Sequence, residues 1–250
     1  MGECNSMCCK EEGVLNQDPL MLKSNSNAAT TNPEVEHGAP HYVGRIKNSK
    51  RRVEYPNGSV YEGQLNALNQ REGEGVLTWA DNSKYVGQWK EDLANGRGKL
   101  YHANGDLYDG EWLEDRCHGK GTYTHSTGAV YIGDWEADQQ HGQGHEVWVD
   151  GTRYTGEYKQ GKKDGQGKLV LPDGSTFTGD FKKNLIEGNG TFEWKDGKVY
   201  NGQWLANKMH GKGRLTWPNG RYYDGDFVED RKEGYGVYDW GDGKVYKGQW

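Results

Sequence analysis

The residues best suited to chemistry lie at the start of the chain. It begins Met-Gly-Glu-Cys-Asn-Ser-Met-Cys-Cys, which fits the N-myristoylation pattern Met-Gly-x-x-x-Ser with Gly2 as acceptor after Met1 is removed. One myristoyl chain binds a bilayer weakly, with an association constant of about 10⁴ M⁻¹, so stable anchoring needs a second signal. Cys4, Cys8 and Cys9 provide that signal if they are S-palmitoylated. We therefore expect dual acylation at the N-terminus.

Other roles for this cysteine cluster are weaker. The adjacent pair Cys8 and Cys9 does not give the paired spacing of a structural zinc site. Disulfides are not expected in the reducing cytosol. Free thiols on a flexible tail are the remaining alternative to palmitoylation.

The rest of the chain offers no convincing catalytic, metal or cofactor site. Recurrent Gly-x-Gly pairs are not followed by Gly-Lys-Ser/Thr, so they do not predict nucleotide binding. His118, His141 and His210 occupy one recurrent position that holds Glu187 or Asn95 elsewhere. This exchange indicates a polar loop residue. No serine or cysteine has an evident base beside it, so no enzyme activity, cofactor or bound metal is expected.

Charge is unevenly distributed along the 250 residues, whose formal net charge is −6. Residues 1–41 carry six acidic and two basic side chains, and a basic segment follows at Arg45, Lys47, Lys50, Arg51 and Arg52. Each of these five contributes about 1 kcal/mol near anionic headgroups, so lipid contact is one expectation and a solvated loop is the other. The region after residue 52 is acidic, which argues against a nucleic-acid partner.

A repeated aromatic pattern shows how the rest of the chain is organised. Hydrophobic content is 32% and mean hydropathy is −1.08, values that alone would suggest disorder. However, a Tyr-x-Gly-x-aromatic pentad recurs at a spacing of 23 residues after a first step of 24. It begins at Tyr61, Tyr85, Tyr108, Tyr131, Tyr154, Phe177, Tyr200, Tyr223 and Tyr246. A fixed period of this length predicts a repeat architecture.

Each repeat reads as a β-hairpin. Positions +0, +2 and +4, counted from the first residue of the pentad, share one strand face, which therefore carries Tyr, Gly and an aromatic ring. The opposite face is polar, as at Asp109 and Glu111. A second strand follows the Gly-x-Gly pair, and a turn such as Asn104-Gly105 closes the unit. Asn82 replaces the turn glycine in one unit. Because Asn is the residue that tolerates positive φ best after glycine, backbone conformation explains the residue type at that position. Single hairpins are marginal in water, so the units must stack.

These repeats resemble MORN (membrane occupation and recognition nexus) repeats. The resemblance rests on units such as Tyr108-Asp-Gly-Glu-Trp112 followed by His118-Gly-Lys-Gly121. It implies an all-β fold, an elongated, twisted, single-layer antiparallel sheet of stacked 23-residue hairpins. We predict three regions: a disordered acylated tether at 1–41, a degenerate capping half-repeat at 42–60, and eight repeats plus the first strand of a ninth at 61–250.

The resemblance also implies a class of function, since MORN proteins commonly organise membranes and cytoskeletal assemblies, including cilia. We predict a non-enzymatic scaffold on the cytosolic face of a membrane, plasma or ciliary, associated with the cytoskeleton. Its aromatic face would bind an amphipathic helix of a protein partner or a second copy of the chain, with Trp135, Trp148 and Tyr154 as contacts. The alternative is that these rings only hold successive hairpins together.

Two other functions remain open at this stage. MORN arrays also precede catalytic domains, so the chain is alternatively a regulatory module of a longer enzyme such as a phosphatidylinositol phosphate kinase. Direct phosphoinositide binding by the repeats has little electrostatic support in an acidic region.

Overall fold

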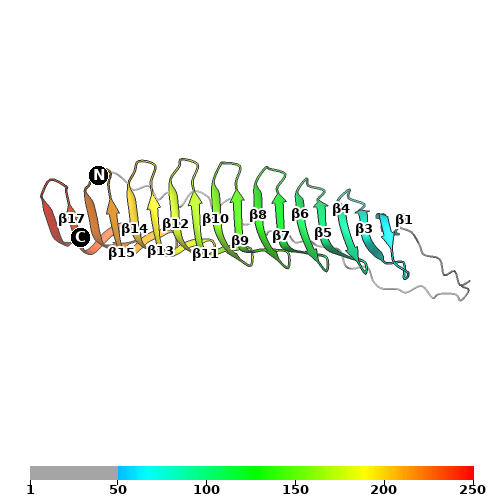
Figure 1. The fold of residues 1–250 in the computed structure, drawn as a ribbon. Coiled ribbons are helices and arrows are strands. Elements are labelled where there is room, and N and C mark those ends of the chain that lie inside the picture. The colour runs from blue at the N-terminus through cyan, green and yellow to red at the C-terminus, as the bar shows by residue number, and fades with distance from the viewer. Residues whose placement is uncertain (1–49) are drawn as a thin grey trace, which may run out of the picture. The chain divides into compact units, whose positions relative to one another are not determined.

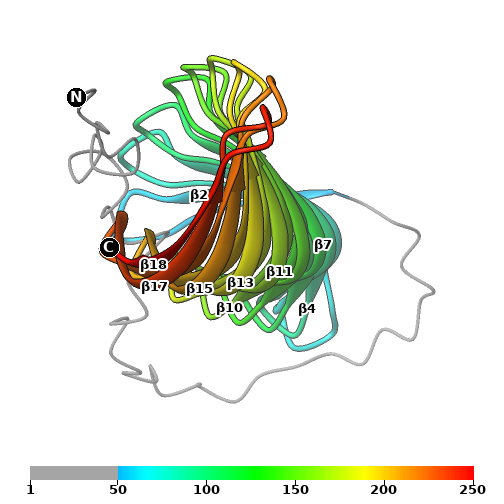
Figure 2. The ribbon, with the colours of Figure 1, turned by 90° about the vertical axis from the view of Figure 1, so that its left-hand side faces the viewer.

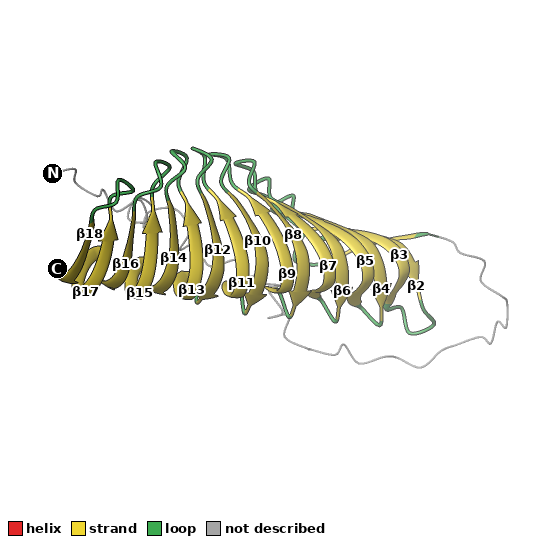
Figure 3. Cartoon of the chain, turned by 60° about the vertical axis from the view of Figure 1, so that its left-hand side comes forward, coloured by secondary structure: helices red, strands yellow, loops and turns green. Residues whose placement is uncertain are grey.

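The computed structural model describes residues 50–250. Its regular elements are all β-strands (Figure 3), and no helix of a length and hydropathy that could cross a bilayer occurs in this range. The strands are β1 (Arg51–Glu54), β2 (Val60–Leu65), β3 (Arg71–Thr78), β4 (Lys84–Lys90), β5 (Leu93–Tyr101), β6 (Leu107–Leu113), β7 (Arg116–Thr124), β8 (Val130–Glu136), β9 (Gln139–Val147), β10 (Arg153–Lys159), β11 (Lys162–Val170), β12 (Thr176–Lys182), β13 (Leu185–Glu193), β14 (Val199–Leu205), β15 (Lys208–Thr216), β16 (Tyr222–Val228), β17 (Arg231–Asp239) and β18 (Val245–Gln249).

The described residues divide into two compact units. The first comprises 50–126 and 136–138, and the second comprises 127–135 and 139–250. Strands β1 to β7 of the first unit pair antiparallel in chain order (Figure 1). In the second unit β9 to β18 pair in the same way. The predicted all-β fold of stacked antiparallel hairpins is confirmed.

A row of glycines crosses the strands of each compact unit, because the +2 glycine of a repeat lies opposite the second glycine of a Gly-x-Gly pair. In the first unit the row consists of Gly63, Gly75, Gly87, Gly98, Gly110 and Gly121. In the second it runs from Gly144 through Gly156, Gly167, Gly179, Gly190, Gly202, Gly213, Gly225 and Gly236 to Gly248. From β10 to β18, each strand is rotated relative to the one before it (Figure 2). This rotation is the usual twist of a β-sheet.

The first glycine of the Gly-x-Gly pair forms a β-bulge. Between β12 and β13 the register shifts after Gly179, and Gly188 takes a φ of +121°. The bulge frees the next amide, and Asn189 N–H donates to Asp180 Oδ2 at 2.7 Å. The same contact is made by the +3 side chains Gln88, Glu157, Gln203 and Asp226 with Arg97, Gln166, Lys212 and Tyr235. The +3 residues are therefore structural acceptors, although they lie on the polar face.

The two strands of a hairpin meet in a turn that the repeat pattern does not predict. Glu114 and Asp115 both have positive φ, 51° and 63°, as a type I′ turn requires. Asp115 Oδ1 accepts the Ala94 N–H at 2.6 Å, and Asp115 N–H donates to Ala94 O at 3.0 Å. These bonds link the turn to the preceding hairpin. The same side-chain acceptor occurs at Asp92, Asp138, Asn184, Asn207 and Asp230.

The turns between units follow the prediction. Gly105 has a φ of +92°, and Asn82, which replaces the glycine in one unit, has a φ of 67°. Asn tolerates this region better than other residues with a side chain. Backbone conformation therefore accounts for the Asx-Gly pattern.

Candidate partner-binding surface

The first tyrosine of each pentad lies flat over the glycine row. A Cβ built on Gly110 or on Gly121 would lie 2.5 Å from Tyr108 Oη, so both positions exclude a side chain. Tyr108 Oη donates to Glu111 O at 2.9 Å. The equivalent bond is made by Tyr61, Tyr85, Tyr131, Tyr154, Tyr200, Tyr223 and Tyr246. The glycines are thus required by the close approach of a ring from their own pentad.

The +4 ring links each hairpin to the one before it. Trp112 packs edge-to-face on Tyr108 of its own pentad and on Tyr85 of the preceding one, with ring centroids 5.2 and 5.1 Å apart. Its indole Nε1 donates to Gly98 O at 3.1 Å. Trp204 makes the same contacts with Tyr200 and Phe177 in the second unit. Edge-to-face pairs contribute about 0.5–1.5 kcal/mol beyond area burial, so these rings stabilise the stacking.

The residues predicted to bind a partner lie in two environments. Trp135 is 3% exposed and Tyr154 is fully buried. Trp135 packs on Tyr131, and Tyr154 contacts Tyr158 and Phe181. Trp148 is half-buried at the edge of the same face. For all three, a role in partner binding stays a prediction, but only Trp148 presents accessible ring surface.

The accessible part of the aromatic face is a row at the end of the second strand of each hairpin. In the second unit this row, here called the aromatic rim, consists of Trp148, Leu171, Trp194, Trp217 and Trp240. Cations lie over its rings: Lys163 Nζ is 4.4 Å from the Trp148 ring, Lys198 Nζ 4.1 Å from Trp194, and Arg221 Cζ 4.8 Å from Trp217. The rim is therefore both aromatic and cationic.

A buried charged pair lies behind Trp148. Tyr158 Oη donates to Glu146 Oε2 at 2.7 Å, and Lys163 Nζ lies 3.7 Å from the same oxygen. The side chains of Lys163 and Glu146 are only 14% and 16% exposed. Burial lowers the pKa of Lys163, and the Glu146 carboxylate opposes that shift. Burial and the same carboxylate raise the pKa of Tyr158. Lys163 lies opposite the +4 ring of its hairpin, a position that holds the buried residues Ala94, Ile186 or Met209 in other repeats.

The first unit has a polar cluster of its own around Asp106. The carboxylate accepts hydrogen bonds from Tyr123 Oη at 2.6 Å, Ser126 N at 2.8 Å and Asn104 Nδ2 at 2.9 Å. Burial acts to raise the pKa of Asp106, but these bonds outweigh it and lower the pKa to about 2. His125 Nδ1 is 3.7 Å from Asp106 Oδ2. The cluster connects two successive turns between repeats.

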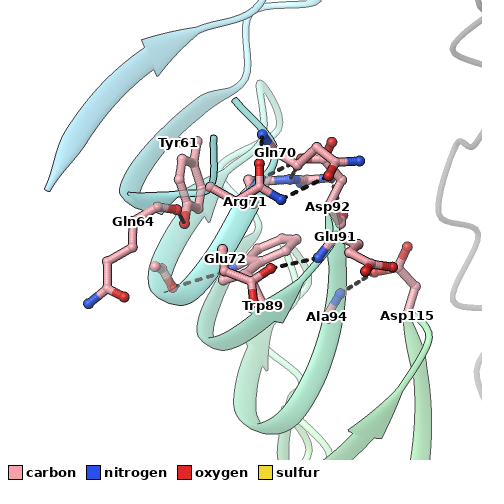
Figure 4. A network of polar contacts seen from close by, with 12 residues as sticks. Tyr61, Gln64, Gln70, Arg71, Glu72, Trp89, Glu91, Asp92, Ala94 and Asp115 are labelled. Carbon is pink, nitrogen blue, oxygen red and sulfur yellow. Dashed lines mark hydrogen bonds and ion pairs between the residues drawn. The ribbon is translucent and has the colours of Figure 1, made fainter. Parts of the chain in front are cut away.

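A second polar network in the first unit is centred on Arg71 (Figure 4). Its Nε lies 3.1 Å from Asp92 Oδ1, and its guanidinium lies 4.2 Å from the centre of the Trp89 ring. Nearby, Glu91 N–H donates to Glu72 Oε2 at 3.1 Å. These contacts join β3 to the turn between β4 and β5, which is a structural role.

None of these clusters suggests catalysis. Within residues 50–250, no group of three or more His, Cys, Asp and Glu side chains is placed to hold a metal ion. Cys117 is fully buried, and burial raises the pKa of its thiol, which disfavours the reactive thiolate.

The predicted membrane-contact residues lie mostly outside the described range. Those outside it are Gly2, Cys4, Cys8, Cys9, Arg45 and Lys47. Lys50 and Arg51 are exposed. Arg52 is also exposed but forms ion pairs with Glu62 at 2.8 Å and Glu54 at 3.1 Å. Acylation and lipid contact stay predictions.

Comparison with solved structures found low overall similarity. The TCP10 domain of CPAP from Danio rerio is 14% identical, with a TM-score of 0.45 over 80% of this chain and 94% of that one. The TCP domain of SAS-4 from Drosophila melanogaster, in complex with a proline-rich motif of Ana2, is 15% identical, with a TM-score of 0.40 over 76% and 99%.

Comparison with families gave a clear result. A search of curated proteins found no match. The MORN repeat model matches eight consecutive segments, residues 61–84, 85–107, 108–130, 131–153, 154–176, 177–199, 200–220 and 223–245. Their boundaries coincide with the pentads, and together they cover well over half of the chain. The protein therefore belongs to the MORN-repeat family.

Proposed function

We propose that the protein is a non-enzymatic scaffold that recruits protein partners through its aromatic rim and is held on the cytosolic face of a membrane by its acylated N-terminus. The recruiting role rests on one observation, which is that the aromatic face has a buried part and an accessible part. The pentad rings from Tyr61 to Phe227 are buried by contacts within the sheet, whereas the rim rings Trp148, Trp194, Trp217 and Trp240 keep accessible surface.

The spacing of the rim suits an amphipathic helix. Successive rim residues come from successive hairpins, two strands apart, so they recur at roughly 10 Å. Two turns of an α-helix rise about 10.8 Å. A helix with an apolar side chain at every seventh position can therefore place one side chain against each rim residue. Tryptophan is also enriched among residues that dominate binding energy.

The tether is supported by the sequence alone. Gly2 with Cys4, Cys8 and Cys9 supplies the two lipid signals that stable anchoring requires. The exposed side chains of Lys50 and Arg51 lie just before the repeats, where they would face the headgroups. Such an arrangement concentrates partners at the membrane without requiring any chemistry from the repeats.

Replacing Trp148 tests the recruiting role. We expect Trp148→Ala to weaken capture of a wild-type partner at least tenfold while the circular dichroism spectrum stays unchanged. The matched control is His145→Ala, because His145 lies on β9 three residues earlier and bonds Thr155 on the other face at 2.7 Å. A folded Trp148→Ala protein that keeps every partner, or equal losses in the two variants, would rule out the rim as the binding surface.

A further inference from the structure

Lys232 lies in a cage of four aromatic rings. Its Nζ is 5.1 Å from the ring centre of Trp217, 5.0 Å from Tyr223, 4.5 Å from Tyr238 and 4.9 Å from Trp250. These rings attract a cation but do not neutralise it. Within residues 50–250 the structure gives the Lys232 side chain no ion pair. A half-buried charge is thus left without a counter-ion.

A second cation, which also has no counter-ion among the described residues, lies beside it. The Arg221 guanidinium is 4.8 Å from the centre of the Trp217 ring, which Lys232 also faces. Arg221 Nε is buried and has no hydrogen-bond partner among the described residues. Burial lowers the pKa of Lys232, and the positive charge of Arg221 lowers it further. Partial burial makes an unpaired charge costly, and within residues 50–250 no carboxylate pairs with either cation.

The second compact unit also contains a lysine in this environment that does have a counter-ion. Lys163 occupies the equivalent position three repeats earlier, over the equivalent rings of Trp148 and Tyr154. Its counter-ion is Glu146, 3.7 Å away. The residue equivalent to Glu146 beside Lys232 is Leu215. Among residues 50–250, therefore, a carboxylate lies at the first site and none lies at the second.

We propose that the Lys232 site, formed by Trp217, Arg221, Lys232 and Trp250, binds a carboxylate side chain of a protein partner. The proposal rests on the recruiting role of the aromatic rim and specifies its chemistry. Glu146 shows that a carboxylate fits this environment. The surrounding rings, with Trp240 47% exposed beside them, favour a glutamate flanked by apolar residues.

The test uses the full-length chain labelled with ¹⁵N in its tryptophan indoles, and a capped pentapeptide, Ala-Leu-Glu-Leu-Ala. We expect the peptide to shift the indole signals of Trp217 and Trp250. The same peptide with glutamine in place of glutamate should bind at least tenfold more weakly, because it cannot pair with either cation.

Substitutions distinguish an ion pair with the peptide from nonspecific apolar binding of the peptide. Lys232→Met should remove the preference for glutamate. The matched control is Lys198→Met, which removes a lysine 4.1 Å from the Trp194 ring and should leave the preference intact. Leu215→Glu should supply an internal counter-ion, as Glu146 does, and block the peptide, whereas Leu215→Gln should not. If either Leu215 variant fails to fold, the Lys232→Met result decides.

Several outcomes would overturn the proposal. Equal binding of the glutamate and glutamine peptides would do so, as would a preference that persists in Lys232→Met. Tighter binding of a phosphoserine peptide would assign the site to phosphorylated partners. A Trp217 signal that depends on protein concentration alone would assign it to a second copy. If the carboxylate preference is absent while Trp148→Ala still loses its partner, the recruiting role stands and only this inference fails.

Discussion

At the scale of single residues, glycine determines how closely the tyrosines pack. The ring of Tyr131 covers Gly133 and Gly144, so neither position has space for a Cβ. The pattern of pentads was sufficient to predict that tyrosine, glycine and an aromatic ring share one strand face, on which the glycine leaves space. It did not show that the tyrosine of the same pentad fills the space, because that depends on a side-chain rotamer.

Substituting this glycine should destabilise the second unit. A Cβ at Gly133 would lie 2.6 Å from Gln143 O and 2.7 Å from Gly144 Cα, and backbone atoms cannot move aside cheaply. We expect Gly133→Val to lower the free energy of unfolding, measured with urea, by at least about 1–3 kcal/mol. Ile132→Val is the control, since Ile132 is 53% exposed on the opposite face of the same strand and surface substitutions usually change stability by less than about 0.5 kcal/mol. Equal stability of the two variants would contradict the packing explanation.

Asp106 gives the first unit a dependence on pH. Its pKa is lowered from 3.8 to about 2 in the folded state, so its stabilising effect is complete above pH 4 and is lost as the pH falls through about 2. The shift corresponds to roughly 2 kcal/mol. The difference in unfolding free energy between wild type and Asp106→Asn should therefore shrink by about that amount from pH 5 to pH 2. Tyr123→Phe removes one donor and should reduce the effect. A difference that does not change with pH would contradict the assignment.

At the scale of the hairpin, two turns alternate, and only one was predictable. The turn between repeats carries Asx-Gly, whose preference for positive φ is well known. The turn within each repeat uses pairs such as Glu114-Asp115 and Ala206-Asn207, which contain no glycine. Its Asp or Asn is fixed by a hydrogen bond to the preceding hairpin, a contact between repeats that spacing within one repeat does not reveal.

One repeat lacks the Asp or Asn side chain in this turn, so introducing it should raise the free energy of unfolding. Gly161 occupies the place of Asn184 and Asn207 and has a φ of +74°. Gly161→Asn should add a hydrogen bond to the preceding hairpin and stabilise the protein by about 1 kcal/mol. Gly161→Ala has the same backbone strain without the acceptor and should destabilise it by about 1 kcal/mol. Urea unfolding curves distinguish them. If Asn is no better than Ala, the contact between hairpins contributes little.

At the scale of the whole molecule, the 23-residue period was enough to predict the class of fold and the number of repeats, because every repeat obeys the same local rules. The binding surface was less predictable. Trp135 and Tyr154 belong to the same pattern as Trp148, and only the packing shows that two of the three are buried. Lys232, which has no ion pair among residues 50–250, was also missed, because its significance lies in Leu215, a residue from another repeat.

The membrane tether determines whether the scaffold acts where we propose, and it lies outside the described residues. The measurement that tests it most directly is the membrane-bound fraction in cells. We expect Gly2→Ala to move the protein to the soluble fraction, since it removes the myristoyl acceptor. Changing Cys4, Cys8 and Cys9 to Ser should leave only weak, reversible attachment. Cys117→Ala, which alters the buried cysteine of the repeats, should stay membrane-bound like the wild type. If Gly2→Ala and the triple variant both remain in the membrane fraction, the acylated tether is wrong.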